Sequence, residues 1–352
     1  MLTTCVRRGA LLAAALVTGL ATSLTTVSGA AAAADPIFLN PSALSQGAAP
    51  AIPYFDPATK VLHDGSKTLT LTGLQGTVVQ LHKVDGGYLL GRSTGGTGAD
   101  IVFVSSAGKR TLITTQWKPP TCDCLRTDVV VDSGGGSVTF NRKTPSRFYK
   151  DTITVSLPAL KIIRTRVFSS PAALYEARQG RVLLGLGSRL LRWTPKTNAI
   201  ATVSSGGLGT TAADTSAGQQ ATRADNGGGN QMVGPMPPAT GSSWPLDADE
   251  NISAWSADNQ HIAGSFEIVS GSTDNGFIVR RASDGASELV VYIPAPAKIT
   301  WEDNTTVLFP TDYDFGDELQ LVRCTLAGEC QRVGPATTSY AKLYVVATRR
   351  SN

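Results

Sequence analysis

The feature that most constrains the fold of this 352-residue chain is a repeat of short alternating segments. In ISAWSADNQHIAGSFEI, which begins at Ile252, apolar and polar residues alternate on both sides of a polar turn. Alternation with a period of two around a turn predicts a β-hairpin. A second such segment, GFIVRRASDGASELVVYI, follows it. The two together predict four short strands in about 40 residues.

The same order of strands and turns recurs along the chain. KITW, TVLF, ELQLVRC and ECQRVG form a copy at 298–334, in which Trp301 takes the place of Trp255. Further copies lie at 77–115, 128–167 and 172–204. A period of about 40 residues with four strands per unit is typical of β-propeller blades, small sheets that bury their faces against neighbouring sheets. We therefore expect Trp255 and Trp301 to pack between blades.

Three segments fit the repeat less well. Residues 206–248 are rich in Gly, Ser, Thr and Pro, and they represent either a degraded blade or a long loop between blades. Residues 52–73 predict one hairpin, and residues 339–347 predict a single strand. We expect this last strand to join the N-terminal hairpin and close the ring, which removes exposed sheet edges. The prediction is an all-β, single propeller of seven four-stranded blades, or of six if 206–248 is a loop.

The first 34 residues have the three-part pattern of a secretory signal peptide. The pair Arg7-Arg8 precedes the apolar run 9–24, and small residues follow as far as Ala34. This pattern predicts cleavage near Ala34-Asp35, which leaves one domain, residues 35–352, outside the cell or in its envelope. The apolar run is shorter than the usual membrane span of about 20 residues, which favours cleavage over an uncleaved anchor, and no later stretch reaches that length. The paired arginines leave the general and the twin-arginine export routes both open.

Charge argues against a nucleic-acid partner. Residues 35–352 carry 29 basic residues against 27 acidic ones, because two of the 31 basic residues and none of the 27 acidic ones precede them. A nearly neutral chain without a basic run lacks the electrostatic footprint of nucleic-acid binding. We expect no nucleic-acid partner, and we expect a monomer.

Cysteine usage agrees with export. Four cysteines follow the predicted cleavage site, namely Cys122, Cys124, Cys324 and Cys330. An even number in an exported chain predicts disulfides. Cys324 and Cys330 flank the turn TLAGE between two strand-like runs, so we expect two local pairs, Cys122 with Cys124 and Cys324 with Cys330. A metal or redox site is the alternative, but the spacings do not match a common zinc site.

Motifs that carry chemistry are scarce. The sequence has neither a G-x-S-x-G nor an H-E-x-x-H motif, and its three histidines have no metal-ligand spacing. Two acidic clusters are weak calcium candidates: Asp247, Asp249 and Asn251, and the group Asp312, Asp314 and Asp317. The first opens like an EF-hand loop but has Ile252 where that loop needs Gly, so it predicts at most a looser site. Solvated acidic turns are the alternative, and we expect no other cofactor.

The segment WSADNQHIA resembles the WSPDG-x-x-IA hairpin of TolB-like, WD40-like propeller repeats. It keeps the Trp, Ser and Asp of that motif, and Asn259 replaces the Gly, which is tolerable because Asn accepts positive φ angles. ITWEDNTTVLF is a looser copy. The chain also resembles secreted actinobacterial propellers of unassigned function. The resemblance implies a propeller fold, but the amino-terminal partner-binding domain of TolB has no evident counterpart here.

These observations predict a secreted, non-enzymatic propeller that serves as a binding scaffold. Loops on two faces and a central channel suit the capture of an extracellular or envelope protein, of a glycan or of another ligand. An extracellular lyase or hydrolase with a site at the central channel is the alternative, because propeller enzymes can assemble sites from dispersed loop residues. The sequence does not separate a purely structural envelope component from a scaffold.

Overall fold

The computed structural model describes residues 35–95, 98–114, 129–142, 151–205, 210–223, 231–247, 250–266, 275–293, 299–311 and 319–348. The chain divides into a unit of residues 1–32 and a unit of residues 33–352, and all described residues belong to the second. The predicted signal peptide lies outside the described residues. In the part of the chain that is described, no helix is long and apolar enough to cross a membrane.

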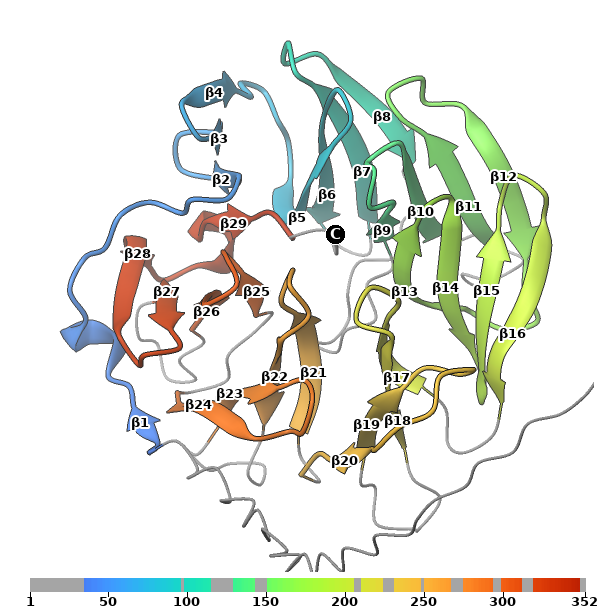
Figure 1. The fold of residues 1–352 in the computed structure, drawn as a ribbon. Helices are drawn as coiled ribbons and strands as arrows, with labels where there is room; N and C mark the ends of the chain where they lie inside the picture. The colour runs from blue at the N-terminus through green and yellow to red at the C-terminus, as the bar shows by residue number, and fades with distance from the viewer. Residues whose placement is uncertain are drawn as a thin grey trace, which may run out of the picture. The chain divides into compact units, whose positions relative to one another are not determined.

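The strands form seven sheets arranged as the blades of a propeller, as Figure 1 shows. We number the blades along the ring and begin with the one that contains both ends of the domain. Blade 1 comprises β29 (Val345–Val346), β2 (Tyr54–Asp56), β3 (Val61–Asp64) and β4 (Lys67–Thr70). Blade 2 comprises β5 (Thr77–Val84), β6 (Gly87–Gly95), β7 (Gly98–Ser105) and β8 (Arg110–Thr114). Blade 3 comprises β9 (Val129–Val131), β10 (Ser137–Arg142), β11 (Asp151–Ser156) and β12 (Ile162–Val167). Blades 4 and 5 comprise β13 (Ala173–Arg178), β14 (Arg181–Leu186), β15 (Arg189–Thr194) and β16 (Ala199–Ser205); and β17 (Thr210–Asp214), β18 (Gln219–Arg223), β19 (Gln231–Pro235) and β20 (Trp244–Pro245). Blades 6 and 7 comprise β21 (Glu250–Trp255), β22 (His261–Phe266), β23 (Gly276–Arg281) and β24 (Ser287–Tyr292); and β25 (Thr300–Trp301), β26 (Thr306–Pro310), β27 (Leu319–Thr325) and β28 (Cys330–Thr337).

The predicted seven-bladed propeller is confirmed. The segment 206–248, for which the sequence left two interpretations open, supplies the four strands of blade 5. Its inner strand, β17, contains Ala212 and Ala213, and its outer strand, β20, has two residues. Small side chains and a short edge strand explain why the alternating pattern is faint in this blade.

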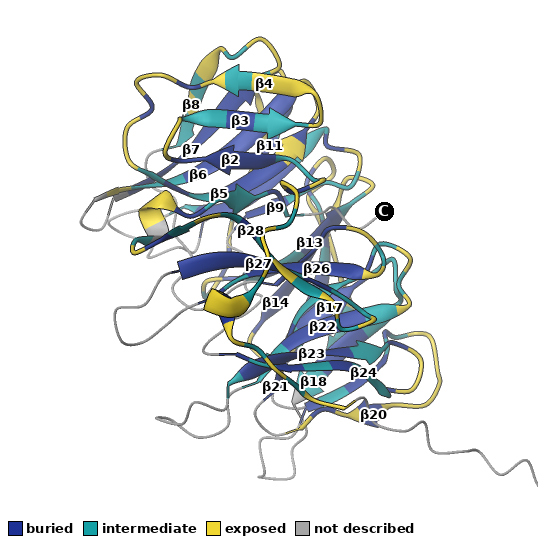
Figure 2. Cartoon of the chain, turned by 90° about the vertical axis from the view of Figure 1, so that its left-hand side faces the viewer, coloured by how far each residue is buried: buried dark blue, intermediate teal, exposed yellow. Residues whose placement is uncertain are grey.

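The ring closes where the N- and C-terminal strands meet. Tyr54 of β2 pairs with Val346 of β29 in antiparallel register, and Leu81 of blade 2 bridges to Ala347. The sequence predicted one hairpin in residues 52–73, whereas the structure has three strands there, β2 to β4. The additional strand, β4, is largely exposed, so one face of it needs no apolar residues. Figure 2 shows burial decreasing outward from β2 to β4.

A segment that the repeat does not include runs along the outside of blades 7 and 6. We call residues 36–50 the N-terminal strap. It contains β1 (Ile37–Phe38), which pairs in parallel with β24, and the 3₁₀ helix η1 (Pro41–Ala43). Gln46 then bridges to Arg332 of β28 before the chain enters blade 1 (Figure 1). A second 3₁₀ helix, η2 (Tyr340–Lys342), precedes β29. The strap pairs with two outer strands, which blunts sheet edges that would otherwise be free to pair with other chains.

The apolar core is divided into seven clusters, one at each interface between adjacent blades. Burial of these faces is the main favourable term in the stability of the ring. The clusters differ in size. Among the described residues, the cluster between blades 6 and 7 has 12 buried apolar members, whereas the cluster between blades 4 and 5 has four.

The antiparallel order of the strands places all first hairpin turns of the blades on one face of the ring. We call this the turn face. The β13–β14 turn of blade 4, the β17–β18 turn of blade 5 and the β21–β22 turn of blade 6 lie on it. The tight turns that join the third and fourth strands lie on the same face.

Candidate functional site

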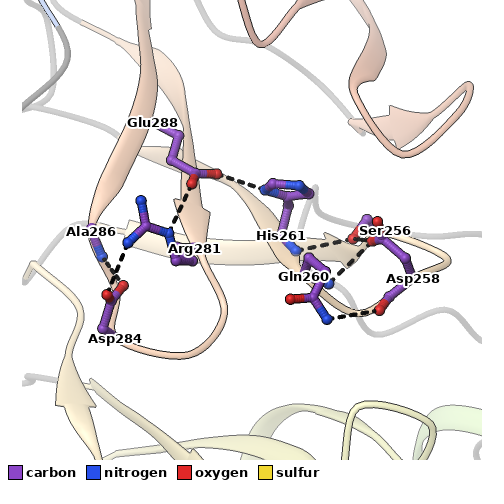
Figure 3. Close-up of polar contacts among 8 residues, drawn as sticks. All are labelled: Ser256, Asp258, Gln260, His261, Arg281, Asp284, Ala286 and Glu288. Atoms are coloured by element: carbon purple, nitrogen blue, oxygen red, sulfur yellow. Dashed lines mark hydrogen bonds and ion pairs between the residues drawn. The ribbon is translucent and has the colours of Figure 1, made fainter.

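The Trp-Ser-x-Asp turn that carries the family resemblance has an internal structural role. The Ser256 hydroxyl donates to Asp258 Oδ1 at 2.6 Å and accepts from the backbone N–H of His261 at 3.0 Å (Figure 3). Asn259 has a φ of 60°, so the residue that replaces the family's Gly does occupy the left-handed region. Burial raises the pKa of Asp258, but hydrogen bonds from Ser256 and Gln260 outweigh this and lower it below its ordinary value. These bonds fix the turn.

The ring of His261 belongs to a separate polar network. Its Nδ1 lies 2.6 Å from Glu288 Oε2, and Glu288 Oε1 accepts from Arg281 Nε at 3.0 Å (Figure 3). Arg281 also forms an ion pair with Asp284 at 3.1 Å. The Ser256 hydroxyl bonds to the backbone of His261 and not to its ring, so these residues do not form a Ser-His-acid triad. The network ties β22, β23 and β24 together at the turn face.

The two predicted inter-blade tryptophans each contact the preceding blade. Trp255 Nε1 donates to Gln219 Oε1 of blade 5 at 3.1 Å, and its ring packs against the cluster between blades 5 and 6. Trp301 is 1% exposed and donates to the Ala254 carbonyl of blade 6 at 3.2 Å. The tryptophan at the end of the first strand therefore donates to the preceding blade in both cases, to a side chain from Trp255 and to a backbone carbonyl from Trp301.

At the first calcium candidate, the guanidinium group of Arg280 takes the place that a cation would need beside Asp247. Arg280 Nε donates to Glu250 Oε2 at 2.9 Å, and its Nη2 bonds to Glu250 Oε1 and to Asp247 Oδ2. Asn251 is exposed on β21, and Asp249 lies outside the described residues. Burial raises the pKa of Glu250 even though Arg280 acts in the opposite direction. The carboxylates of Asp247 and Glu250 thus already face a cation.

The remaining predicted site residues divide into described and undescribed ones. Asp312, Asp314 and Asp317, like Cys122 and Cys124, lie outside the described residues. Within the described ranges, no three His, Cys, Asp or Glu side chains are grouped so that they could hold a metal ion. Cys324 and Cys330 form the disulfide that the turn TLAGE predicted, between directly opposed positions of β27 and β28.

A hollow of about 310 Å³ opens between blades 4 and 5 at the turn face, and it is the site that the sequence did not reveal. It is lined by Glu176, Arg178, Gln179, Arg181, Leu183, Arg192, Thr215 and Ser216. Blade 4 supplies the first six of these residues, and the β17–β18 turn of blade 5 supplies the last two. The hollow lies at the interface that has the smallest apolar cluster.

The register of blade 4 explains why three arginines gather on one face of its sheet. Arg178 is directly opposite Arg181 across the β13–β14 hairpin, and Leu183 is directly opposite Arg192. Side chains two residues apart in a strand share a face, so all four point towards blade 5. Gln179 and Gly180 form the two-residue turn with φ angles of 50° and 71°, the positive values that a type I′ turn requires.

The guanidinium groups of the hollow are without partners in the part of the chain that the structure describes. None of the three arginines forms a hydrogen bond or an ion pair with another described residue, and Arg178 Nη1 is buried without any hydrogen-bond acceptor. Like charges directly opposite each other on a sheet are destabilising, as Arg178 and Arg181 are. This arrangement costs stability, which is the pattern expected where residues are retained for binding.

The rest of the lining is rigidly held. Glu176 is buried, and its Oε2 accepts from the backbone N–H of Thr215 at 2.7 Å and from its hydroxyl. Ser216 Oγ bonds to Asp214 Oδ1 and to Asn259 Oδ1, which connects the turns of blades 5 and 6. On the other side, Gly180 N–H donates to Asp132 Oδ1 of blade 3 at 2.8 Å. These bonds link the lining of the hollow to blades 3, 5 and 6.

The lining can bind an anion but is poorly equipped for acid–base chemistry. Arginine stays protonated at all physiological pH values and presents a planar fork of donors that matches carboxylate and phosphate groups. Glu176 is the acidic residue of the lining, and its Oε2 accepts from the backbone N–H and the hydroxyl of Thr215. No histidine or cysteine is among the lining residues. One signal for this site was present in the sequence, because the hairpin AALYEARQGRVLLGLG places two arginines directly across a Gln-Gly turn.

No family model matches the sequence, and no curated protein matches it. Several solved structures, in contrast, are similar to this chain. TolB from Acinetobacter baumannii aligns at 14% identity with a TM-score of 0.45, over 85% of this chain and 66% of that chain. A chain of the Mitotic Checkpoint Complex aligns at 10% identity with a TM-score of 0.52, over 78% of this chain and 85% of that one.

The β-propeller domain of the Trilobed protease from Pyrococcus furiosus aligns at 10% identity with a TM-score of 0.51, over 74% of this chain and 86% of that one. The chain is a β-propeller. At such low identity the two neighbours with TM-scores above 0.5 show the fold alone, and the residues of the site must show what the fold is used for.

Proposed function

We propose that this protein is a non-enzymatic binding scaffold that captures a ligand in the arginine-lined hollow between blades 4 and 5. The observation that carries the proposal is the set of three guanidinium groups without partners in the described chain, around an opening on the turn face. Unpaired charges that persist at a defined opening are explained by a ligand that pairs with them. The seven inter-blade clusters supply the rigid frame that such capture needs.

Export of the scaffold is part of the same proposal. The N-terminal pattern predicts a signal peptide that is cleaved near Ala34-Asp35. The disulfide between Cys324 and Cys330 supports an oxidising compartment, because such bonds persist outside the cytoplasm. An envelope or extracellular location makes an envelope protein, a glycan or a ligand released from the envelope the natural candidates.

Capture from the envelope tests the binding role. The full chain, a double variant Arg178→Ala/Arg192→Ala and a control Arg189→Ala are immobilised and exposed to envelope extract and culture filtrate of the source organism. Arg189 is an exposed residue of the same blade at the opposite end of β15, so its replacement removes an arginine of this blade without touching the hollow.

We expect one component to be retained by the wild type and the control, lost from the double variant, and recovered chemically unchanged. Equal retention by the double variant would place binding elsewhere, and recovery of a cleaved component would indicate an enzyme. Export is tested by intact mass: protein from medium or envelope should begin at Asp35, and an uncleaved cytoplasmic chain would contradict export.

A further inference from the structure

We propose that the hollow between blades 4 and 5 binds a phosphate monoester, with the phosphate held by Arg178, Arg181 and Arg192 and the organic part covering Leu183. The inference rests on the proposed function, because it names the ligand class of the same site. Its basis is the charge, the geometry and the size of the hollow.

Charge favours a doubly charged ligand. Three arginines and one glutamate line the hollow, so its formal charge is +2. Asp214, the next carboxylate along the chain, is not among the lining residues, and its Oδ1 accepts hydrogen bonds from the backbone of Ser216 and Ala217 and from the Ser216 hydroxyl. A phosphate monoester carries about −1.5 to −2 at neutral pH. A single carboxylate would neutralise only half of the charge.

Geometry favours oxygen atoms that accept several forked donors at once. Arg178 and Arg181 meet across the hairpin, and Arg192 extends from the adjacent strand of the same face. Three guanidinium groups around one opening can each present two parallel N–H donors. The three terminal oxygens of a phosphate monoester can accept such a set of donors, whereas a carboxylate has two oxygens.

Size favours an ester over the free ion. The volume of 310 Å³ lies at the lower end of the range of small-molecule sites, roughly 300–1,000 Å³. A free phosphate would leave most of that space empty. Leu183 offers an apolar surface, and the turn of Thr215 and Ser216 offers polar groups, a combination that suits a sugar-sized organic body.

Isothermal titration calorimetry of the full chain tests this assignment with three probes: glucose 6-phosphate, inorganic phosphate and glucuronate. We expect glucose 6-phosphate to bind most tightly and glucuronate to bind at least about tenfold more weakly, because it loses charge-assisted hydrogen bonds. Glucuronate binding equal to or tighter than glucose 6-phosphate would overturn the phosphate assignment. Inorganic phosphate binding as tightly as the ester would overturn the role of the organic part.

Two variants show that binding occurs in the hollow. Arg181→Ala removes an exposed side chain and should weaken the binding of glucose 6-phosphate about tenfold or more, without lowering the thermal unfolding midpoint. Arg192→Lys keeps the charge but not the fork, and should also weaken binding. The control Arg189→Ala should bind as the wild type does. Unchanged binding in both hollow variants would overturn the site.

The two proposals can fail separately. If an envelope component is captured through Arg178 and Arg192 but glucose 6-phosphate does not bind, the ligand class is wrong and the scaffold role stands. If capture is independent of these arginines and glucose 6-phosphate does not bind, both proposals are wrong.

Discussion

The interface between blades 6 and 7 and the interface between blades 4 and 5 differ in how many apolar residues they bury and in how their polar groups are paired. The first contains 12 buried apolar residues among those described, including Phe277 and Phe309 with ring centroids 4.4 Å apart. The second contains four, and a hollow lined by three unpartnered arginines opens beside them. The comparison suggests that one interface is built to hold the ring together, whereas the other exchanges stability for a binding site.

The polar groups follow the same division. Between blades 6 and 7, His261 and Arg281 are both paired with Glu288. On the other face of blade 7, which meets blade 1, Glu302 forms an ion pair with Arg323, and Arg323 donates to the carbonyl groups of Ala48 and Ala49 in the N-terminal strap. Between blades 4 and 5, Glu176 and Thr215 are paired, but the guanidinium groups are not.

The largest effect that would sharpen this contrast is expected from apolar truncation. Phe309→Ala should lower the free energy of unfolding by about 4 kcal/mol, because a fully buried aromatic side chain leaves a cavity. Met236→Ala, in the small cluster between blades 4 and 5, should cost about 2 kcal/mol. Chemical denaturation of both variants measures the difference. Equal costs would break the comparison.

The ion pair that anchors the strap gives the next largest effect. Glu302→Ala should lower the free energy of unfolding by about 3 kcal/mol, because it leaves the half-buried guanidinium of Arg323 without its carboxylate. It should also increase amide hydrogen exchange at Ala51, since the Ala51 N–H donates to Glu302. Glu329→Ala, an exposed carboxylate on the same blade, is the control and should change neither quantity. Unaltered exchange in the Glu302 variant would show that the pair does not hold the strap.

The disulfide of blade 7 should contribute less. Replacing Cys324 and Cys330 together by Ala should cost about 2 kcal/mol, because the bond closes a short loop and restricts the unfolded chain only modestly. Comparing the midpoints of denaturant unfolding of the double variant and of the oxidised wild type measures the contribution. A loss as large as that of Phe309→Ala would mean that the bond, and not the apolar cluster, dominates blade 7.

The smallest expected effect is a change in the free energy of unfolding with pH, and it comes from Asp258. The folded-state pKa of Asp258 is below its ordinary value, so the stability that its ionised form contributes is present above its unfolded pKa of about 3.9 and is lost as pH falls through the folded pKa. Asp258→Asn should therefore be less stable than the wild type at about pH 7, and this difference should shrink at about pH 3. A difference that is constant with pH would show that the carboxylate contributes only as a neutral hydrogen-bond acceptor.

The fold was predictable to a large extent because its signal is local. Alternation around turns located the hairpins, and the Trp-Ser-x-Asp segment marked the end of an inner strand. Closure by the terminal strands followed from the need to remove sheet edges. Blade 5 was ambiguous because small residues such as Ala212 and Ala213 weaken the alternating pattern. The strap was not predicted because β1 pairs with β24, about 250 residues away, and carries no repeat of its own.

The site was harder to predict because it depends on which face of blade 4 meets blade 5. The sequence shows that Arg178 and Arg181 flank a turn, and a cross-strand pair of like charges is a recognisable anomaly. It does not show that Arg192 joins them or that Leu183 lies below them, since these follow from the register between β14 and β15. The hollow itself exists because the facing turn of blade 5 does not fill the space.

The most direct test of this account measures stability and binding in one variant, Arg178→Met, which keeps an unbranched apolar stem but removes the guanidinium group and its charge. The account predicts that the free energy of unfolding rises by about 1 kcal/mol, because a buried donor without an acceptor and a like-charge repulsion both disappear. Capture of the envelope component should be lost at the same time. A variant that is less stable than the wild type, or that still captures the component, would contradict the claim that this interface gives up stability for binding.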